Sequence, residues 1–303
     1  MGVKKIKSGS VIGEKDHSGT LSKEEELGTI QITTLSDNTA NIGCIAEWGL
    51  SILITTKNRC ILLDTGISFN TTHNADRLGI DLSEVDKIIL SHGHFDHTGG
   101  LHEVLRRTGE IEVIGHPDIW EPKYARVDDR EFYAGIPFQR LELESLGARF
   151  ILTREPVMIG DGIMTTGEIP MVTDFEKIDP DVFVSKDGTL QQDPMADDLA
   201  LVIETEVGLI VILGCAHRGI INTLYHAQNL TGNKTVYAAI GGAHLFRAPE
   251  IQIDKTVAAL KDLGIKRLGL SHCTGFNAAC RLFQEMPDAV FMNNAGTRTT
   301  LPY

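Results

Sequence analysis

Hydrophobic and polar positions alternate in three short runs early in the chain, at residues 29–35, 47–55 and 59–63. Alternation puts apolar side chains on one face of an extended segment, so each run predicts a half-buried strand. Lys57 and Asn58 lie between the second and third runs and favour a hairpin turn. These runs together predict an antiparallel sheet.

Beyond residue 80 the pattern changes to apolar strands that alternate with helices. A strand that ends at Leu90 is followed by a helix at residues 101–107 and a strand at 111–114. The second half repeats this texture, with strands expected at 163–166, 199–205, 208–214, 235–240 and 267–270, and helices at 220–230 and 251–263. The last of these helices has apolar residues at helical spacing and is closed by Gly264.

Each half of the chain begins with predicted strands and continues with alternating strands and helices. This order predicts an α/β fold, a four-layer αββα sandwich. We expect one domain over residues 28–303, preceded by a polar extension at 1–27. The segments 119–155 and 174–197 are longer and more polar than the other connections, so they are expected to be insertions over the site.

Composition and charge narrow the classes of function. The 303 residues are 42% hydrophobic and 23% charged, which is ordinary for a globular protein, and the net charge is −13 with scattered basic residues. A nucleic-acid-binding surface would need a basic patch, so a nucleic-acid partner is not expected. No run approaches the roughly 18 to 20 apolar residues of a membrane span. We expect a small-molecule substrate and no membrane partner, and a homo-oligomer stays open.

The beginning of the sequence lacks the apolar stretch of a secretory signal, so a cytoplasmic location is the default expectation. Five cysteines form an odd set without a CxxC pair, which favours reduced thiols over a disulfide framework.

Candidate chemistry concentrates directly after the strand that ends at Leu90. His92, His94, Asp96 and His97 lie within six positions there. Imidazoles two residues apart can converge on one cation, while Asp96 and His97 can turn towards a second. Nitrogen and carboxylate donors suit Zn²⁺, with Mn²⁺ or Fe as alternatives. A solvated histidine-rich turn is the structural alternative.

This HxHxDH pattern, followed by Thr98-Gly99-Gly100, resembles the second motif of the metallo-β-lactamase superfamily. The segment 61–66 resembles the first motif of that superfamily, a strand that ends in Asp-x-Gly. The segment 268–275 resembles the strand that delivers its last histidine. The resemblance covers residues 29–301.

Three further segments, 214–219, 241–245 and 271–275, resemble one branch of the superfamily, the 7,8-dihydropterin-6-methyl-4-(β-D-ribofuranosyl)aminobenzene-5′-phosphate synthases. The branch implies a pterin-like substrate. Its substrate need not transfer to this chain, because the site and not the fold decides the chemistry.

The resemblance to the superfamily implies roles for individual residues. His92 and His94 would bind one metal ion, and Asp96, His97 and His272 a second. Asp64 would hold the metal loop or a histidine N–H by hydrogen bonds, with a helix or turn cap as its alternative role.

The remaining ligand positions depart from the superfamily pattern. Glu168 stands where a third histidine is usual, and Cys215 stands where an aspartate usually bridges the ions. His217 follows two residues later, and alternation in an extended segment puts it on the same face as Cys215. We favour His217 as a ligand first, Cys215 second and Glu168 last. Cys215 as a small buried residue and His217 as a structural histidine are the alternatives.

His244 follows a buried strand and a Gly-Gly pair at the same expected edge. We assign it a catalytic role beside Asp96, as a donor to a substrate anion or leaving group, with a structural histidine as the alternative. His73, His102, His116 and His226 have no convergent neighbours in sequence and are expected on the surface or in packing.

Two metal ions about 3.5 to 4 Å apart lower the pKa of a bridging water towards about 7 and clamp an oxyanion. The expected function is therefore a two-metal enzyme, a hydrolase or transferase, that acts on a small phosphorylated or pterin-like molecule. A phosphodiesterase or phosphatase-like hydrolase is the second candidate. A non-catalytic ligand-binding protein on the same scaffold is the third, and a flavodiiron role lacks its flavin domain.

Overall fold

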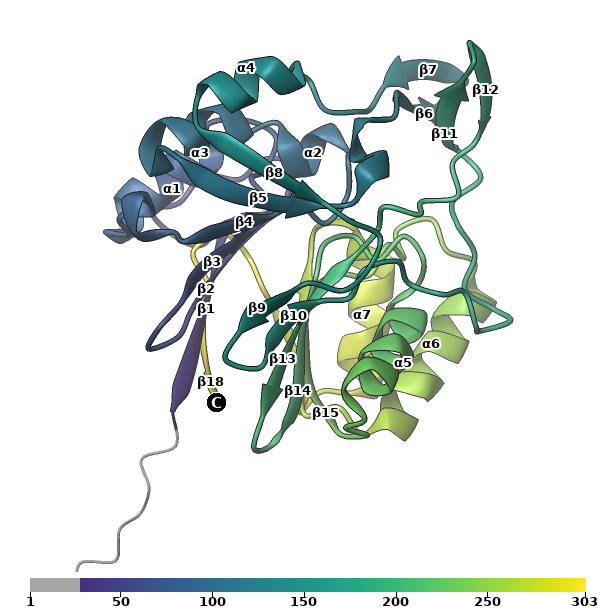
Figure 1. The fold of residues 1–303 in the computed structure, drawn as a ribbon. Coiled ribbons are helices and arrows are strands. Elements are labelled where there is room, and N and C mark those ends of the chain that lie inside the picture. The colour runs from purple at the N-terminus through teal and green to yellow at the C-terminus, as the bar shows by residue number, and fades with distance from the viewer. Residues whose placement is uncertain (1–27) are drawn as a thin grey trace, which may run out of the picture.

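The computed structural model describes residues 28–303, so the polar extension expected at residues 1–27 lies outside the described part. Two seven-stranded sheets face each other, and helices cover the outer face of each one (Figure 1). This is the αββα sandwich that the sequence predicts.

The first sheet combines antiparallel and parallel pairing in the order β18-β1-β2-β3-β4-β5-β8. Its strands are β1 (Thr29–Ser36), β2 (Ser51–Thr55), β3 (Cys60–Leu63), β4 (Lys87–Ile89), β5 (Ile111–Gly115), β8 (Ala148–Leu152) and β18 (Arg298–Pro302). The first three pair antiparallel, as the alternating runs predict, and β3, β4, β5 and β8 pair parallel. Its outer face packs against α1 (Asn70–Leu78), α3 (Leu101–Thr108) and α4 (Arg140–Ser145).

The second sheet has the order β17-β16-β15-β14-β13-β10-β9. Its strands are β9 (Met158–Gly160), β10 (Ile163–Thr165), β13 (Ala200–Thr205), β14 (Gly208–Leu213), β15 (Val236–Gly242), β16 (Arg267–Ser271) and β17 (Val290–Met292). Three helices cover it: α5 (Ile220–Thr231), α6 (Glu250–Leu263) and α7 (Phe276–Glu285). Gly264 ends α6 with a φ of 67°, as expected. Among the helices of residues 28–303, none is long and apolar enough to cross a membrane.

One core lies between the two sheets and another lies between the second sheet and its helices, and β14 contributes to both. Every residue of β14 is buried. Ile210 and Ile212 face the core between the sheets, whereas Leu209, Val211 and Leu213 pack under the helices. A strand that is buried on both faces needs a continuous apolar run, and this is the pattern of its sequence.

A third, four-stranded sheet lies to one side of the sandwich (Figure 1). It pairs β6 (Lys123–Val127) and β7 (Arg130–Tyr133) with β11 (Val182–Lys186) and β12 (Thr189–Gln192). The strands come from the two segments expected to be insertions, which therefore meet in one unit. The expected segment 119–155 is too wide, because it also contains α4 and β8 of the main sandwich.

Lys123 connects this third sheet, through hydrogen bonds to two aspartates, to the loop that carries the histidines. Its side chain is buried, and Nζ donates to Asp193 Oδ2 at 2.7 Å and to Asp197 Oδ1 at 2.8 Å. The other oxygen of Asp197 accepts from the backbone N–H of Gly93 at 2.8 Å. Burial disfavours the charged ammonium, but the two carboxylates outweigh it and raise the pKa of Lys123.

We predict that Lys123→Met lowers the free energy of unfolding by about 3 to 5 kcal/mol, because it leaves two buried carboxylates without their cation. Lys186→Met is the matched control in the same sheet. Lys186 forms an exposed pair with Glu121 at 3.4 Å, so its loss is expected to cost less than about 1 kcal/mol. Urea unfolding of both variants measures the difference, and equal small losses would contradict the structural role of Lys123.

Candidate metal centre

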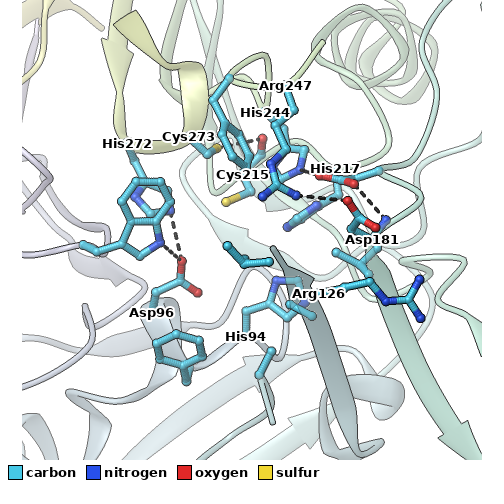
Figure 2. A pocket seen from close by; sticks show the side chains of 18 of the residues that line it. His94, Asp96, Arg126, Asp181, Cys215, His217, His244, Arg247, His272 and Cys273 are labelled. Carbon is cyan, nitrogen blue, oxygen red and sulfur yellow. Dashed lines mark hydrogen bonds and ion pairs between the residues drawn. The ribbon is translucent and has the colours of Figure 1, made fainter. Parts of the chain in front are cut away.

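Four strand ends deliver the candidate ligands to one edge of the sandwich. The loop after β4 carries His92, His94, Asp96 and His97, with the last two in the short helix α2 (Phe95–Thr98). The loops after β14, β15 and β16 carry the ligands that come later in the chain. β14, β15 and β16 are parallel neighbours in the second sheet, so their carboxyl ends meet at one edge, and the loop after β4 reaches that edge from the first sheet. Figure 2 shows His94, Asp96, Cys215, His217 and His272 gathered around a pocket, with the guanidinium of Arg126 directed away from them.

The first donor group consists of His92, His94 and His217, all buried. His92 Nε2 lies 3.0 Å from His94 Nδ1 and 3.2 Å from His217 Nε2. A tetrahedral ion with Zn–N bonds of about 2.0 to 2.1 Å would hold its nitrogen ligands roughly 3.3 Å apart. The spacing of these three nitrogens therefore fits one zinc-sized cation.

The protonation of these imidazoles also favours a cation. Ser91 Oγ donates to Asp64 Oδ2 at 2.6 Å, so the Nδ1–H of His92 donates to Ser91 Oγ at 2.9 Å and leaves Nε2 as a bare lone pair. Burial lowers the pKa of His92 and His217 well below the usual value, and that of His94 to about 3. Neutral imidazole is the form that binds metal.

The second donor group consists of Asp96, His97 and His272. His272 Nε2 lies 3.3 Å from Asp96 Oδ2, while its Nδ1 lies 2.8 Å from Asn38 Oδ1. Because Asn38 Oδ1 accepts a hydrogen bond from the Nδ1–H of His272, the Nε2 lone pair faces a carboxylate oxygen. Two acceptors that face each other need a cation between them, and His272 Nε2 has no hydrogen-bond partner in the described residues.

Cys215 lies between the two groups. Its Sγ is 3.0 Å from His97 Nε2, and it belongs to one compact donor set with His92 and His97 and to another with His272 and Cys273. Burial raises the pKa of the Cys215 thiol. A metal ion would have to displace that proton to gain a thiolate ligand.

Asp64 orients both groups without facing the space between the donors. Its Oδ1 accepts from the backbone N–H of Ser91 at 2.7 Å, and its Oδ2 lies 2.6 Å from His97 Nδ1. Burial alone would lower the pKa of His97, but the Asp64 charge outweighs it and raises the pKa to about 9. Asp64 therefore fixes the proton on Nδ1 of His97 and directs Nε2 towards Cys215 and the other donors.

Trp48 is a part of the site that the sequence did not reveal. Its indole N–H donates to Asp96 Oδ2 at 3.0 Å, and its ring lies 5.1 Å from that of His272. An indole donor on a carboxylate orients the oxygen that faces the second group. Nothing in the pattern of the sequence near Trp48 marks it, because its partners come from distant loops.

Glu168 does not join the donor groups, which corrects the expectation that it might replace the third histidine. Its carboxylate pairs with Arg154 and lies 3.0 Å from His116 Nε2. These two partners lower the pKa of Glu168 and hold it on a partly exposed surface. His217 provides the third nitrogen instead.

His244 lies beside the donor groups, as expected from its place after β15. Its ring centroid is 4.0 Å from that of His217, and its Nε2 is 3.6 Å from Asp179 Oδ2. Burial disfavours the charged ring, but Asp179 and Cys273 outweigh it and raise the pKa of His244 to about 9. Its donor atom also lies within 4.8 Å of those of Cys215 and His217, so His244 stands at the edge of the donor groups.

The backbone is strained at this edge. Asp64, Ala216, His244 and His272 all have positive φ, between 45° and 59°. Such conformations cost non-glycine residues on the order of 1 to 3 kcal/mol each and gather at functional sites, where the surrounding structure enforces them. Two of the four residues, His244 and His272, belong to the candidate donor sets.

A cavity of about 320 Å³ lies over the donors. The third sheet and the loop after β15 form its outer walls, while His94, Asp96, Cys215, His217 and His272 line its floor (Figure 2). Both segments that the sequence marks as insertions contribute to it, through Arg126 and Asp181. The donors are therefore accessible to a small molecule.

The sequence model of the metallo-beta-lactamase superfamily matches residues 49–272 of the chain. A relative from Methanocaldococcus jannaschii, named 7,8-dihydropterin-6-methyl-4-(beta-D-ribofuranosyl)-aminobenzene-5′-phosphate synthase, is 36% identical over 89% of this chain and 96% of its own length. An uncharacterized protein from the same organism is 33% identical over 84% of this chain and 94% of its own length.

Among solved structures, Tm1679, a metal-dependent hydrolase of the beta-lactamase superfamily, superposes with a TM-score of 0.78 at 30% identity and covers 90% of this chain and 100% of its own. The Zn²⁺-bound PqqB from Methylobacterium extorquens has a TM-score of 0.53 at 12% identity, over 90% and 100% of the two chains. The second likeness concerns the fold alone.

We predict that His92→Ala, His94→Ala and Asp96→Ala each lower the metal content of the purified protein, because each removes a donor atom from a buried group. Elemental analysis of protein refolded or dialysed with zinc measures the loss. His102→Ala is the control, because His102 lies on α3 outside both groups. Full metal content in all three variants would rule out the assignment.

For the two unusual positions, we predict that His217→Ala loses more metal than Cys215→Ala, and that Cys215→Ser is tolerated. His217 supplies one of the three nitrogens of the first group, so its loss leaves that group with two donors. Loss of Cys215 leaves all three donors of each group in place. The same metal analysis tests the ranking. Loss of one ion in Cys215→Ser, with two retained in His217→Ala, would show that the thiolate is the more important ligand.

Proposed function

This chain belongs to the metallo-β-lactamase superfamily, and we propose that it is a two-metal enzyme that acts on a small phosphorylated, pterin-like molecule. The observation that carries the proposal is the meeting of two buried donor groups at the floor of a cavity with aromatic walls and two arginines. We propose two divalent ions, with zinc favoured by the nitrogen and sulfur donors and Mn²⁺ or Fe as alternatives.

The cavity wall suits a flat ring that carries an anionic group. Trp48, Phe95, Phe132 and Phe246 supply aromatic surface, and such surfaces bind planar rings. The Methanocaldococcus jannaschii relative is named for a product that contains a pterin, and the pterin ring is planar. A pterin ring bound against these aromatic side chains would hold its substituent close to the metal donors.

Arg126 and Arg247 would bind phosphate at the wall. The Arg247 guanidinium lies 5.3 Å from the ring centre of Phe246 and 3.2 Å from Asp181. Arg126 pairs with Glu131 at 2.6 Å. Both ion pairs are exposed and contribute little, so a phosphate group can replace the carboxylates at small cost.

Two divalent ions bound by these residues would supply a water of lowered pKa and hold phosphate oxygens. The chain itself contributes three things: Trp48 and Asp64 orient the ligand side chains, the third sheet forms one wall of the cavity, and His244 provides a proton. The raised pKa of His244 keeps it charged at neutral pH, so it can donate to a departing oxygen.

The reaction has two candidate forms. The name of the Methanocaldococcus jannaschii relative favours transfer of a pterin methylene group to an arylamine. The likeness to Tm1679, a metal-dependent hydrolase, favours hydrolysis of a phosphate ester by the same groups. A cytoplasmic, reducing compartment suits both, because Cys215 must stay a free thiol to serve as a donor.

The most direct test measures metal content together with turnover of a small panel. The panel contains a dihydropterin diphosphate with and without an arylamine, and a simple phosphodiester. Product that forms only with both pterin and amine supports transfer, and turnover of the phosphodiester alone supports the hydrolase. Absence of turnover by fully metallated protein for every member of the panel would overturn the proposal.

We predict that His244→Ala retains two metal ions and lowers turnover by about 10² to 10⁴-fold, the usual contribution of a positioned acid. His116→Ala is the control, since His116 is a buried histidine that pairs with Glu168 outside the cavity. The control is expected to lose thermal stability and keep its rate per folded molecule. Unchanged turnover by folded His244→Ala would remove His244 from the reaction.

A further inference from the structure

Cys273 is a buried thiol at the metal centre that belongs to neither of the two donor groups described above. It follows His272 directly, where β16 ends, and it is 1% exposed. It lines the cavity of about 320 Å³ together with Cys215 and His272 (Figure 2). The sulfur of Cys273 therefore lies among the donors, although the sequence did not mark this residue.

The donor atoms of Cys215, His272 and Cys273 all lie within 4.8 Å of one another. The three residues follow β14 and β16, two strands that are separated in the sheet by β15. Zinc binds thiolate sulfur at about 2.3 Å and imidazole nitrogen at about 2.0 to 2.1 Å, so its ligand atoms lie roughly 3.5 to 3.8 Å apart. This set therefore needs to contract by at most about 1 Å to bind one ion.

His272 gives independent evidence that a cation binds beside Cys273. Its Nε2 is buried and has no hydrogen-bond partner among the described residues. Because its Nδ1–H donates to Asn38 Oδ1 at 2.8 Å, Nε2 carries a lone pair. A carboxylate oxygen of Asp96 lies 3.3 Å from Nε2, and both sulfur atoms lie within 4.8 Å. One metal ion satisfies all of these donors, which a single proton cannot do.

The backbone around Cys273 brings two adjacent side chains to one place. Successive side chains of an extended strand point to opposite faces, but the donor atoms of His272 and Cys273 lie close together. The chain leaves the extended conformation at His272, whose φ is 49°. Gly242 on β15 leaves room for the sulfur, since a Cβ there would lie 2.6 Å from Cys273 Sγ. A strained residue and a strand glycine at one spot indicate a functional position.

A packing role explains the surroundings of Cys273 less well. A buried cysteine often acts as a small apolar residue, and Cys60 packs in this way against the core under α1 and α3. Cys273 belongs to none of the apolar clusters that the described residues form. Its thiol donates to the carbonyl oxygen of Cys215 over a long 3.5 Å. Neither apolar packing nor a strong hydrogen bond therefore accounts for its burial.

We propose that Cys273 is a thiolate ligand of the second metal ion, which two cysteines then hold together with His272. The inference rests on the proposed two-metal centre. Each thiol loses its proton to solvent as its sulfur binds the ion. The first group offers nitrogen donors alone, so the two positions differ in softness. Thiolates favour Zn²⁺ and other soft ions over Mn²⁺ and Mg²⁺, and the second position selects zinc in this way.

Cobalt(II) tests this ligand without any turnover. Thiolate bound to Co²⁺ gives an intense charge-transfer band in the near ultraviolet, which imidazole and carboxylate ligands do not give. We expect the wild-type protein to bind two Co²⁺ ions and to show this band. Cys273→Ser is expected to lower the band by about a third to a half, because its intensity follows the number of Co–S bonds. The double variant Cys215→Ser/Cys273→Ser is expected to lack the band.

Cys280→Ser is the matched control, since Cys280 is a half-buried thiol on α7 outside every donor group of the described residues. Its band should equal that of the wild type. An unchanged band in Cys273→Ser, with complete loss in Cys215→Ser, would overturn the proposal.

The wild-type protein provides a measurement that does not depend on the folding of a variant. Loaded with ¹¹³Cd, it is expected to give two resonances, and the one from the second group lies downfield because two thiolates bind that ion. A spectrum in which neither ion has two thiolate ligands would contradict the assignment. In a competition experiment, Cys273→Ser should lower the preference of the second position for Cd²⁺ over Mn²⁺ by about tenfold or more.

Metal content separates this inference from the proposed function. Two bound Co²⁺ ions, with a band that is independent of Cys273, would refute the thiolate ligand and leave the two-metal centre in place. Absence of bound Co²⁺ and Zn²⁺ from folded wild-type protein would refute the two-metal centre and the ligand together.

Discussion

The site depends on one buried carboxylate. Asp64 stands at the end of β3 with a φ of 59° and directs its oxygens into the loop after β4. It holds the backbone and hydroxyl of Ser91 and the ring of His97, and through Ser91 it sets the tautomer of His92. Hydrogen bonds to a charged group contribute about 1.5 to 3 kcal/mol each, so this carboxylate can fix two imidazoles at once.

Much of the sandwich follows from local sequence. The apolar run of β14, the alternation of the first three strands and the glycine after α6 predict their elements because each pattern reports burial directly. The histidine loop can also be predicted from the sequence, since its donors lie within six positions. His217 meets His92 across the sandwich, because β14 and β4 belong to different sheets, so this convergence depends on how the two sheets pack.

Other parts required the three-dimensional structure. Glu168 was assigned by its place in a motif, but its partner Arg154 lies on a neighbouring loop and holds it away from the donors. Trp48 lies 48 positions from its partner Asp96, and Lys123 lies 70 or more positions from Asp193 and Asp197. No local sequence pattern reveals pairs so far apart. The third sheet was equally hidden, because its strands come from two separate insertions that pair only in space.

Two donor groups that each hold one ion are tested most directly by a crystal structure of zinc-loaded protein with anomalous scattering. One peak is expected among His92, His94 and His217, and a second among Asp96, His97 and His272, with Cys215 Sγ between them. A single ion, or ions bound outside these six side chains, would contradict it.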